Sequence, residues 1–131
     1  MQFLLDTDIC IYALNRPSEN LVRQFNAHAH QFCISVITEY ELLFGAQKST
    51  QREENLQKLQ RFTARLDVLE FGTQAADHAG RIRAELERKG TPIGPYDVLI
   101  AGHARSEGLT LVTNNQREFG RVPGLATENW R

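Results

Sequence analysis

The sequence predicts an α/β protein in which helices cover both faces of a small, mainly parallel sheet. Short apolar runs alternate along the chain with longer segments whose apolar residues recur every three or four positions. The first run, Phe3-Leu4-Leu5, is apolar without interruption, which is typical of a central parallel strand buried on both faces. Helical crossovers between parallel strands place helices on both sides of a sheet. We therefore expect a single domain spanning residues 1–131.

Composition places the chain among ordinary globular proteins. It is 41% hydrophobic and 24% charged, which excludes a disordered class. The net charge of -1 neither requires nor excludes a nucleic-acid partner, so only the local distribution of charge can bear on that question. Cys10 and Cys33 sit among apolar neighbours, and we expect buried free thiols.

The chain shows no sign of a membrane or export role. No apolar run approaches the roughly 18 residues that a membrane span needs. The N-terminal residues already form a strand, without a basic leader, so we expect no export signal and no membrane association. The expected location is the cytoplasm.

Four elements are expected in the first 35 residues. The strand of residues 3–5 ends at Asp6, and a short helix follows over residues 9–14 with Asp8 as its N-cap. Residues 16–18, Arg-Pro-Ser, break this helix and open a second one that runs to about residue 28. A second short strand follows at residues 32–35.

A third helix is predicted over residues 36–47, with Ser35 as its cap. At 3.6 residues per turn one arc of this helix is apolar. This arc consists of Val36, Ile37, Tyr40, Leu43 and Phe44. Glu41 lies at one edge of the arc and Glu39 near the other, so helical spacing does not decide which of the two faces the protein.

The second half continues the alternation of helices and strands. A helix over residues 51–66 carries apolar residues at core spacing, and a half-exposed strand follows at residues 67–71. Thr73 is expected to cap the next helix, which ends at Gly90.

A stiff loop of two prolines and a glycine precedes the next helix. Pro95 fits the first helical turn, where its missing N–H costs nothing, so Asp97 falls in the first turn of a helix that continues to Glu107. Residues 109–113 are predicted to form another buried strand, and a last short strand lies near residues 125–127.

Acidic and amide side chains recur where the predicted strands end. All of them follow a strand or lie in the first turns of a helix that does. The set is Asp6, Asp8, one glutamate of the third helix, Asp97, Asn115 and Glu118. Because the carboxyl ends of parallel strands meet at one edge of a sheet, these side chains should converge there.

Converging carboxylates predict a site for a divalent cation. Like charges a few ångströms apart cannot all stay ionised unless a cation lies among them. Oxygen ligands suit Mg²⁺ or Mn²⁺, and no Cys/His spacing suggests zinc. Such a cation would activate a water and neutralise charge on a phosphate, which favours phosphoryl chemistry. Most members of the set have ordinary structural explanations taken singly, but a carboxylate directly ending a buried strand, as Asp6 does, rarely lacks a function.

Three basic residues share one face of the helix over residues 51–66. Lys58, Arg61 and Arg65 are spaced to follow a phosphate backbone. A solvated helical face explains the same pattern, and we favour that explanation. These residues are therefore only weak candidates for RNA binding.

Four motifs in order resemble the VapC-type toxins of the PIN-domain ribonucleases. They span nearly the whole chain, which makes the resemblance specific. The motifs are Leu4-Leu5-Asp6-Thr7-Asp8-Ile9, Ser35-Val36-Ile37-Thr38-Glu39-Tyr40-Glu41-Leu42-Leu43-Phe44-Gly45, Gly94-Pro95-Tyr96-Asp97-Val98-Leu99-Ile100-Ala101 and Leu111-Val112-Thr113-Asn114-Asn115. The resemblance implies a PIN-like three-layer α/β/α fold and a Mg²⁺- or Mn²⁺-dependent endoribonuclease that cuts structured RNA, transfer RNA above all.

The resemblance also implies roles for individual residues. The first acid of the family falls on Asp6, its glutamate on Glu41 and its third acid on Asp97. The position of Asn115 is often aspartate in the wider family, so the resemblance implies that Glu118 serves as the substitute fourth acid. Catalysis and metal binding are accordingly expected of these four acids.

Supporting roles are expected of residues beside the four acids, with Asp8 or Asn115 assisting them directly. Asp8 occupies a position that is commonly asparagine in relatives, so it adds a negative charge. Thr113 and Asn114 are expected to hold the corner near Asn115 by hydrogen bonds. The implied partners are a VapB-type antitoxin, the RNA substrate and a second copy in a homodimer, with operator DNA bound through the antitoxin.

Two other functions fit parts of the sequence. An apolar strand followed by Asp6-Thr7-Asp8 also opens phosphatases of the haloacid-dehalogenase type, in which Asp6 would be the nucleophile. The chain is short for that fold, and no lysine lies near its later strand ends. The amide at Asn115, in place of an acid, is the feature that favours a non-catalytic module binding RNA or protein.

Overall fold

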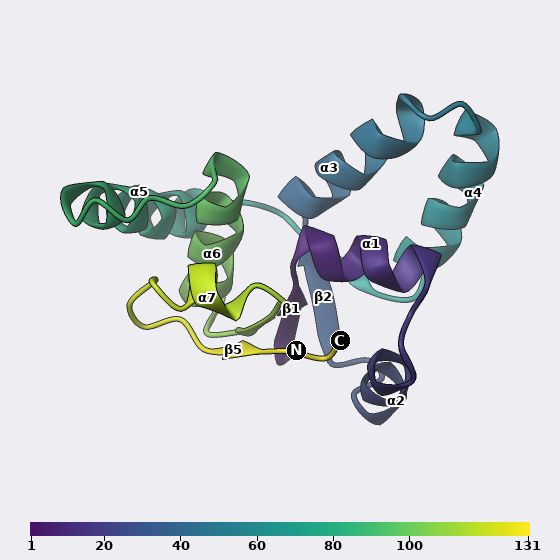
Figure 1. The fold of residues 1–131 in the computed structure, drawn as a ribbon, viewed down its shortest axis with the longest axis horizontal. Coiled ribbons are helices and arrows are strands. Elements are labelled where there is room, and N and C mark those ends of the chain that lie inside the picture. The colour runs from purple at the N-terminus through teal and green to yellow at the C-terminus, as the bar shows by residue number, and fades with distance from the viewer.

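Five parallel strands form one sheet in the computed structural model, which describes residues 1–131. The strand order is β3-β2-β1-β4-β5, and every neighbouring pair is parallel. The strands are β1 (Phe3–Leu5), β2 (Phe32–Ser35), β3 (Asp67–Leu69), β4 (Thr110–Val112) and β5 (Thr127–Glu128). The expected mainly parallel sheet is confirmed, and β1 is its central strand (Figure 1).

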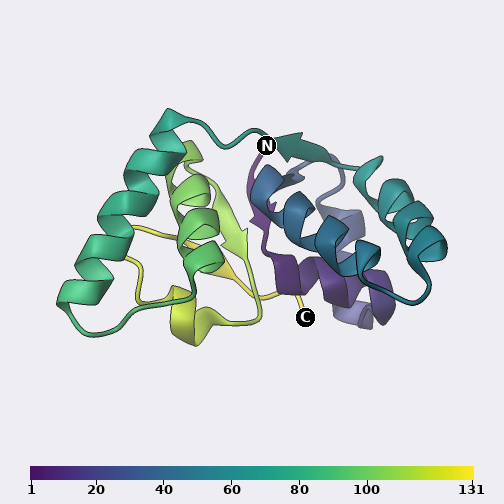
Figure 2. The same ribbon diagram turned by 90° about the horizontal axis from the view of Figure 1, so that it is seen from above.

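Seven helices complete the three expected layers. They are α1 (Thr7–Asn15), α2 (Glu19–Ala27), α3 (Val36–Gln47), α4 (Arg52–Thr63), α5 (Thr73–Arg88), α6 (Pro95–Glu107) and α7 (Gln116–Phe119). Helices α5 and α6 lie on one side of the sheet, and α1, α3 and α4 lie on the other (Figure 2). None of these helices is long and apolar enough to cross a lipid bilayer.

The two sides of β1 belong to two separate apolar cores. Leu4 packs in a cluster with residues of α5 and α6, whereas Phe3 and Leu5 pack with residues of α1, α2 and α4. All three side chains are at most 2% exposed, because successive strand residues point to opposite covered faces. Cys10 and Cys33 are buried free thiols, one in each core, as predicted.

Two helix caps lie one or two residues from their predicted positions. Asp6, not Asp8, caps α1, because its extended backbone (φ -76°, ψ 169°) lets the carboxylate accept from the Ile9 N–H at 2.8 Å. Asp8 lies in the first turn of α1 and is exposed. Helix α5 begins at Thr73 itself, with Gly72 at the cap position.

Helix α3 has the predicted bounds and the predicted Ser35 cap. The prediction of which of its faces is buried was wrong. Thr38, Leu42 and Ala46 face the protein, whereas Tyr40 and Phe44 are 52% and 57% exposed. Leu43 is also exposed. The helix has apolar residues on several sides, so its periodicity cannot select the buried one. Thr38 tolerates burial because its hydroxyl lies 3.1 Å from that of Thr7.

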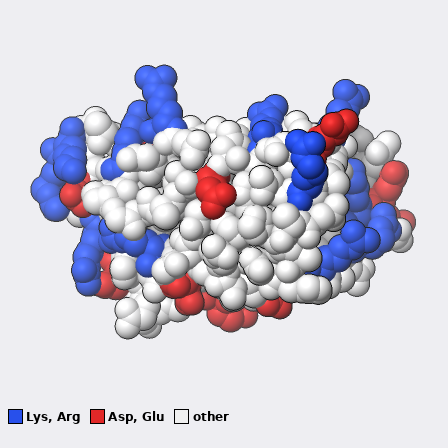
Figure 3. Space-filling view, turned by 90° about the horizontal axis from the view of Figure 1, so that it is seen from below, with Lys and Arg blue, Asp and Glu red and all other residues white.

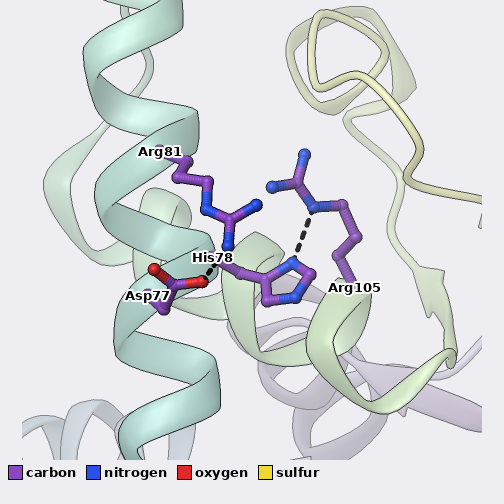
Figure 4. Close-up of polar contacts among 4 residues, drawn as sticks. All are labelled: Asp77, His78, Arg81 and Arg105. Atoms are coloured by element: carbon purple, nitrogen blue, oxygen red, sulfur yellow. Dashed lines mark hydrogen bonds and ion pairs between the residues drawn. The ribbon is translucent and has the colours of Figure 1, made fainter.

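A polar group on the outer surface fastens α5 to α6. The Arg105 Nε donates to Nδ1 of His78 at 2.9 Å, and a second guanidinium N–H donates to the Pro123 carbonyl at 2.8 Å. Arg81 pairs with Asp77 one turn along α5 (Figure 4). These contacts hold α6 in place and thereby hold its first turn, which carries Asp97.

Helices α5 and α6 pack closely at Gly102, and a substitution at this position tests the packing. A Cβ at this position would lie 2.6 Å from the backbone N of Ala79 on α5, so Gly102→Ala must push the helices apart. We expect a loss of about 1–3 kcal/mol in the free energy of unfolding, measured by urea denaturation. Gly80→Ala on α5, where a Cβ meets nothing within 4 Å, is the matched control and should gain about 0.5–1 kcal/mol. A stable Gly102→Ala variant would contradict the packing described here.

Candidate active site

Asp6 lies at the carboxyl end of β1, at the middle of the edge where all five strands end. It is 2% exposed, its backbone N–H donates to Val112 of β4 at 3.0 Å, and its carboxylate caps α1. Burial raises the pKa of Asp6 from 3.8 to about 7, against the lowering effect of hydrogen bonds from Thr113 and the Ile9 N–H. The nearby charges of Asp8 and Asp97 raise this pKa further.

Asp97 occupies the first turn of α6 and faces the same edge. Burial raises the pKa of Asp97 from 3.8 to about 6, and the charges of Glu118, Asp8 and Glu41 add to the rise. The structure thus brings together all five acids named from the sequence. Their mutual repulsion is felt most by the two that are shielded from water.

Glu41, not Glu39, belongs to this group of acids. Its Oε1 accepts a hydrogen bond from the Thr7 hydroxyl at 2.7 Å, which fixes the carboxylate beside the first turn of α1. Glu39 instead lines a hollow between α3 and α4 with Leu43 and Leu56. Thr7 was not singled out from the sequence, although it stands between the two aspartates of the first motif.

Glu118 and Asn115 are joined by a hydrogen bond between their side chains. The Asn115 side-chain amide donates to Oε2 of Glu118 at 2.7 Å, and the Gly94 N–H donates to Oε1 at 3.3 Å. The Thr113 hydroxyl accepts from the Asn115 N–H at 2.9 Å, as expected for this corner. Asn114 was expected to help hold the corner, but it lines a neighbouring cavity with Asp8.

The three basic residues predicted to share one face do not form one strip. Helix α4 ends at Thr63, so Arg65 lies beyond it and lines a hollow beside Phe32. Lys58 lines a different cavity, of about 250 Å³, together with Glu41 and Ile11. Arg61 is exposed on α4. Because α4 ends before Arg65, the three basic residues do not share one helical face.

The set of donors suits a hard divalent cation. The oxygens of Asp6, Glu41, Asp97 and Glu118 are the ligands that Mg²⁺ and Mn²⁺ prefer, and a cation among them would relieve the repulsion that raises two of their pKa values. As the side chains stand, no three acids are near enough to one another to hold one ion, so binding requires carboxylates to turn inward.

His103 is a buried residue of α6 that lies outside the predicted set of site residues. It is 1% exposed, and its Nδ1 lies 2.8 Å from the hydroxyl of Ser35. Ser35 caps α3 and His103 lies on α6, so this contact joins the helices that carry Glu41 and Asp97. Burial lowers the pKa of His103.

Comparison with known proteins gives a family match over most of the chain. The family model described as "PIN domain" matches residues 3–125. The chain is 52% identical to the "tRNA(fMet)-specific endonuclease VapC" of Salmonella typhimurium and 46% identical to "Ribonuclease VapC2" of Haemophilus influenzae, in each case over 99% of this chain and 98% of the relative.

Solved structures give the same result. The DNA-bound VapBC of Salmonella typhimurium superposes with a TM-score of 0.97 at 52% identity, covering 100% of this chain and 99% of that one. VapBC2 of Rickettsia felis, bound to a promoter DNA fragment, gives 0.95 at 41% identity and covers both chains fully. The three-layer arrangement described above is therefore that of these relatives.

The raised pKa of Asp6 predicts how stability depends on pH. In the folded protein Asp6 holds its proton up to about pH 7, whereas the unfolded chain releases it near 3.8, so the free energy of unfolding should fall as the pH rises between these values. Asp6→Asn keeps an acceptor for the Ile9 N–H but carries no charge. Without divalent cations at high pH, we expect it to be more stable than the unmodified protein by on the order of 2–4 kcal/mol.

Urea denaturation over a series of pH values measures this effect. Asp67→Asn, an exposed acid at the opposite end of the strands, is the matched control and should follow the unmodified protein. The raised pKa of Asp6 is wrong if Asp6→Asn shows the same pH dependence as the unmodified chain.

Proposed function

This chain belongs to the PIN domain family, and we propose that it is an endoribonuclease that acts as the toxin of a type II toxin–antitoxin pair. The observation that carries the proposal is the set of four acids, Asp6, Glu41, Asp97 and Glu118, at one edge of the sheet. Burial, together with the charges of neighbouring acids, raises the pKa values of Asp6 and Asp97, as expected of a cation site that acts on phosphodiesters.

The proposed substrate is a structured RNA, with transfer RNA as the first candidate. A relative that is 52% identical over nearly the full length is named as specific for tRNA(fMet). Single-stranded loops of such an RNA expose the backbone and bases that a shallow site can reach. The proposed place of action is the cytoplasm, where these RNAs are found.

We propose Mg²⁺ or Mn²⁺ as the cofactor, held by the four acids. When bound, the cation would neutralise charge on the phosphate and lower the pKa of a water nucleophile. The chain's own residues orient the ligands for this purpose. Thr7 fixes Glu41, and the Asn115 amide and Gly94 N–H fix the two oxygens of Glu118. Asp6 is fixed by its role as the cap of α1.

The other two functions considered from the sequence are less well supported. The PIN fold is not that of haloacid dehalogenases, and the Asp6 carboxylate is buried and engaged at the Ile9 N–H, which disfavours it as a nucleophile. A non-catalytic module was suggested by the amide at Asn115. That amide donates to the carboxylate of Glu118. Glu118 lies one helical turn further on and would supply the acid that position 115 lacks.

The proposed partners are a VapB-type antitoxin and a second copy of this chain. The neighbouring solved structures are VapBC complexes, two of them bound to DNA, and we propose that this chain likewise reaches operator DNA through its antitoxin. Exposed apolar side chains on α1 and α3 offer surfaces for such partners. They include Ile11, Tyr40, Leu43 and Phe44.

Removal of one acid tests the proposed chemistry. Asp97→Asn should lower Mg²⁺- or Mn²⁺-dependent cleavage of tRNA(fMet) by at least about 10²-fold, because it removes a charged ligand and keeps the shape of the side chain. Cleavage is followed on gels, and growth arrest is followed on induction in a bacterial host. Asp67→Asn is the matched control and should keep full activity. An active Asp97→Asn enzyme would overturn the proposed role of the acids.

Thr7 provides a finer test. Thr7→Val removes the donor that holds Glu41 but keeps the volume of the side chain, and we expect a loss of about 10–100-fold in cleavage rate, recovered at higher Mn²⁺. Thr7→Ser keeps the hydroxyl and should behave like the unmodified enzyme. Equal rates for the Val and Ser variants would show that the hydrogen bond does not position Glu41.

A further inference from the structure

A polar cavity of about 450 Å³ opens beside the group of acids. One of its walls is a face of α1 that carries Asp8, Ile11, Tyr12 and Asn15, which follow the helical spacing of three and four. Arg16, Asn114 and Arg131 complete the lining. Asp8 links the cavity to the acids, because it lies in the first turn of α1, two residues after Asp6, which caps the same helix.

Two cationic side chains distinguish this cavity from the adjoining acids, although Asp8 also lines it. Arg16 and Arg131 bring two guanidinium groups to it, and neither takes part in an ion pair. All three ion pairs of the molecule lie on α5 or at its end. Guanidinium groups that are free of ion pairs and lie next to the proposed cation site are suited to phosphates of the RNA chain that is being cut.

The position of Arg131 is fixed by the residue before it. Trp130 is 1% exposed, stacks on His28 with ring centroids 5.1 Å apart, and packs edge-on against Phe3. Its carbonyl accepts from the Asn20 side chain at 3.0 Å. Arg131 is thereby held with its guanidinium 4.4 Å from the centre of the Tyr12 ring. The two planar groups offer a stacking surface.

No extended basic track competes with this cavity on the side where α2 and β5 lie. There, Lys and Arg side chains gather around the rim, and the middle carries almost no charge apart from one acidic patch (Figure 3). On this side of the molecule, RNA binding would therefore rely on a few local groups. The cavity combines two cations with two amides, which can both donate to and accept from base edges.

We infer that this cavity is a subsite for one nucleotide next to the scissile phosphate of a single-stranded RNA segment. The inference rests on the proposed ribonuclease function and deepens it. Arg16 and Arg131 would bind the flanking phosphate, the Tyr12–Arg131 pair would stack on the base, and Asn15 and Asn114 would contact its edge. The volume is of the size that small-ligand sites have, and one nucleotide fills it.

Binding measured without cleavage tests the subsite. Arg16→Gln, Arg131→Gln and the double variant are placed on an Asp97→Asn background, and fluorescence anisotropy gives the Kd for labelled tRNA(fMet) and for a short single-stranded RNA at several salt concentrations. Each substitution should weaken binding by about 10-fold and lower the slope of log K against log salt by about 0.7, because one phosphate contact is lost. Arg88→Gln, at the far end of α5, is the matched control and should change neither quantity.

Variation of the base gives a second readout. Asn15→Ala should reduce the discrimination among RNAs that differ at the nucleotide beside the cut, whereas Arg131→Lys should restore the salt slope but not the affinity that comes from stacking. The subsite is overturned if the double variant binds both RNAs with the Kd and salt slope of the unmodified protein. It is also overturned if the two arginines prove to be needed only for binding an acidic partner protein and not for binding RNA.

The same experiments separate this inference from the proposed function. An unmodified protein that binds RNA through Arg16 and Arg131 but cuts none with Mg²⁺ or Mn²⁺ would refute the ribonuclease and leave the binding site standing. An active enzyme whose binding ignores both arginines would refute the subsite alone.

Discussion

The convergence of carboxylates at one partly buried edge of the sheet is the constraint on which the rest of this structure depends. Every strand is parallel, so every strand ends at the same edge, and the side chains that follow them must meet there. Asp6 is held at the centre of this edge by its place in β1 and by its role as the α1 cap. Burial at this place raises the pKa of Asp6 to about 7, and the charges of Asp8 and Asp97 add to the rise.

The surrounding residues hold this unfavourable arrangement in place. Thr7, Asn115 and the Gly94 N–H each donate to an acid of the group, and Ser35 with His103 joins the two helices that deliver Glu41 and Asp97. Such neutral donors fix the directions of the carboxylates but do not cancel their charge. A bound divalent cation would cancel this charge, and an RNA phosphate would then be able to bind beside it. The two arginines beside Asp8 line the cavity in which we propose that a neighbouring nucleotide binds.

Much of this arrangement could be predicted from the sequence because it depends on strong local signals. The uninterrupted apolar run of β1 and the prolines and glycine before α6 gave the correct order of elements and the correct edge for the acids. Helical spacing could not decide whether Glu39 or Glu41 faces the site, since both flank one apolar arc. It required the family resemblance, and the contact with Thr7 now gives it a physical reason. Whether these acids are catalytic stays a prediction.

Other features depend on tertiary contacts that no local pattern encodes. Helix α3 is apolar on several sides, so only its neighbours decide that Leu42 is buried and Phe44 is exposed. Arg131 and Tyr12 are far apart in the sequence, and their contact depends on Trp130 entering the core.

The measurement that tests the central claim most directly is the number of protons released when Mn²⁺ or Mg²⁺ binds. Calorimetric titration in two buffers of different ionisation enthalpy gives this number. At about pH 6.5 the cation should displace protons from Asp6 and Asp97, and at higher pH it should displace none. Equal heats in both buffers at the lower pH, or no binding at either pH, would contradict the account.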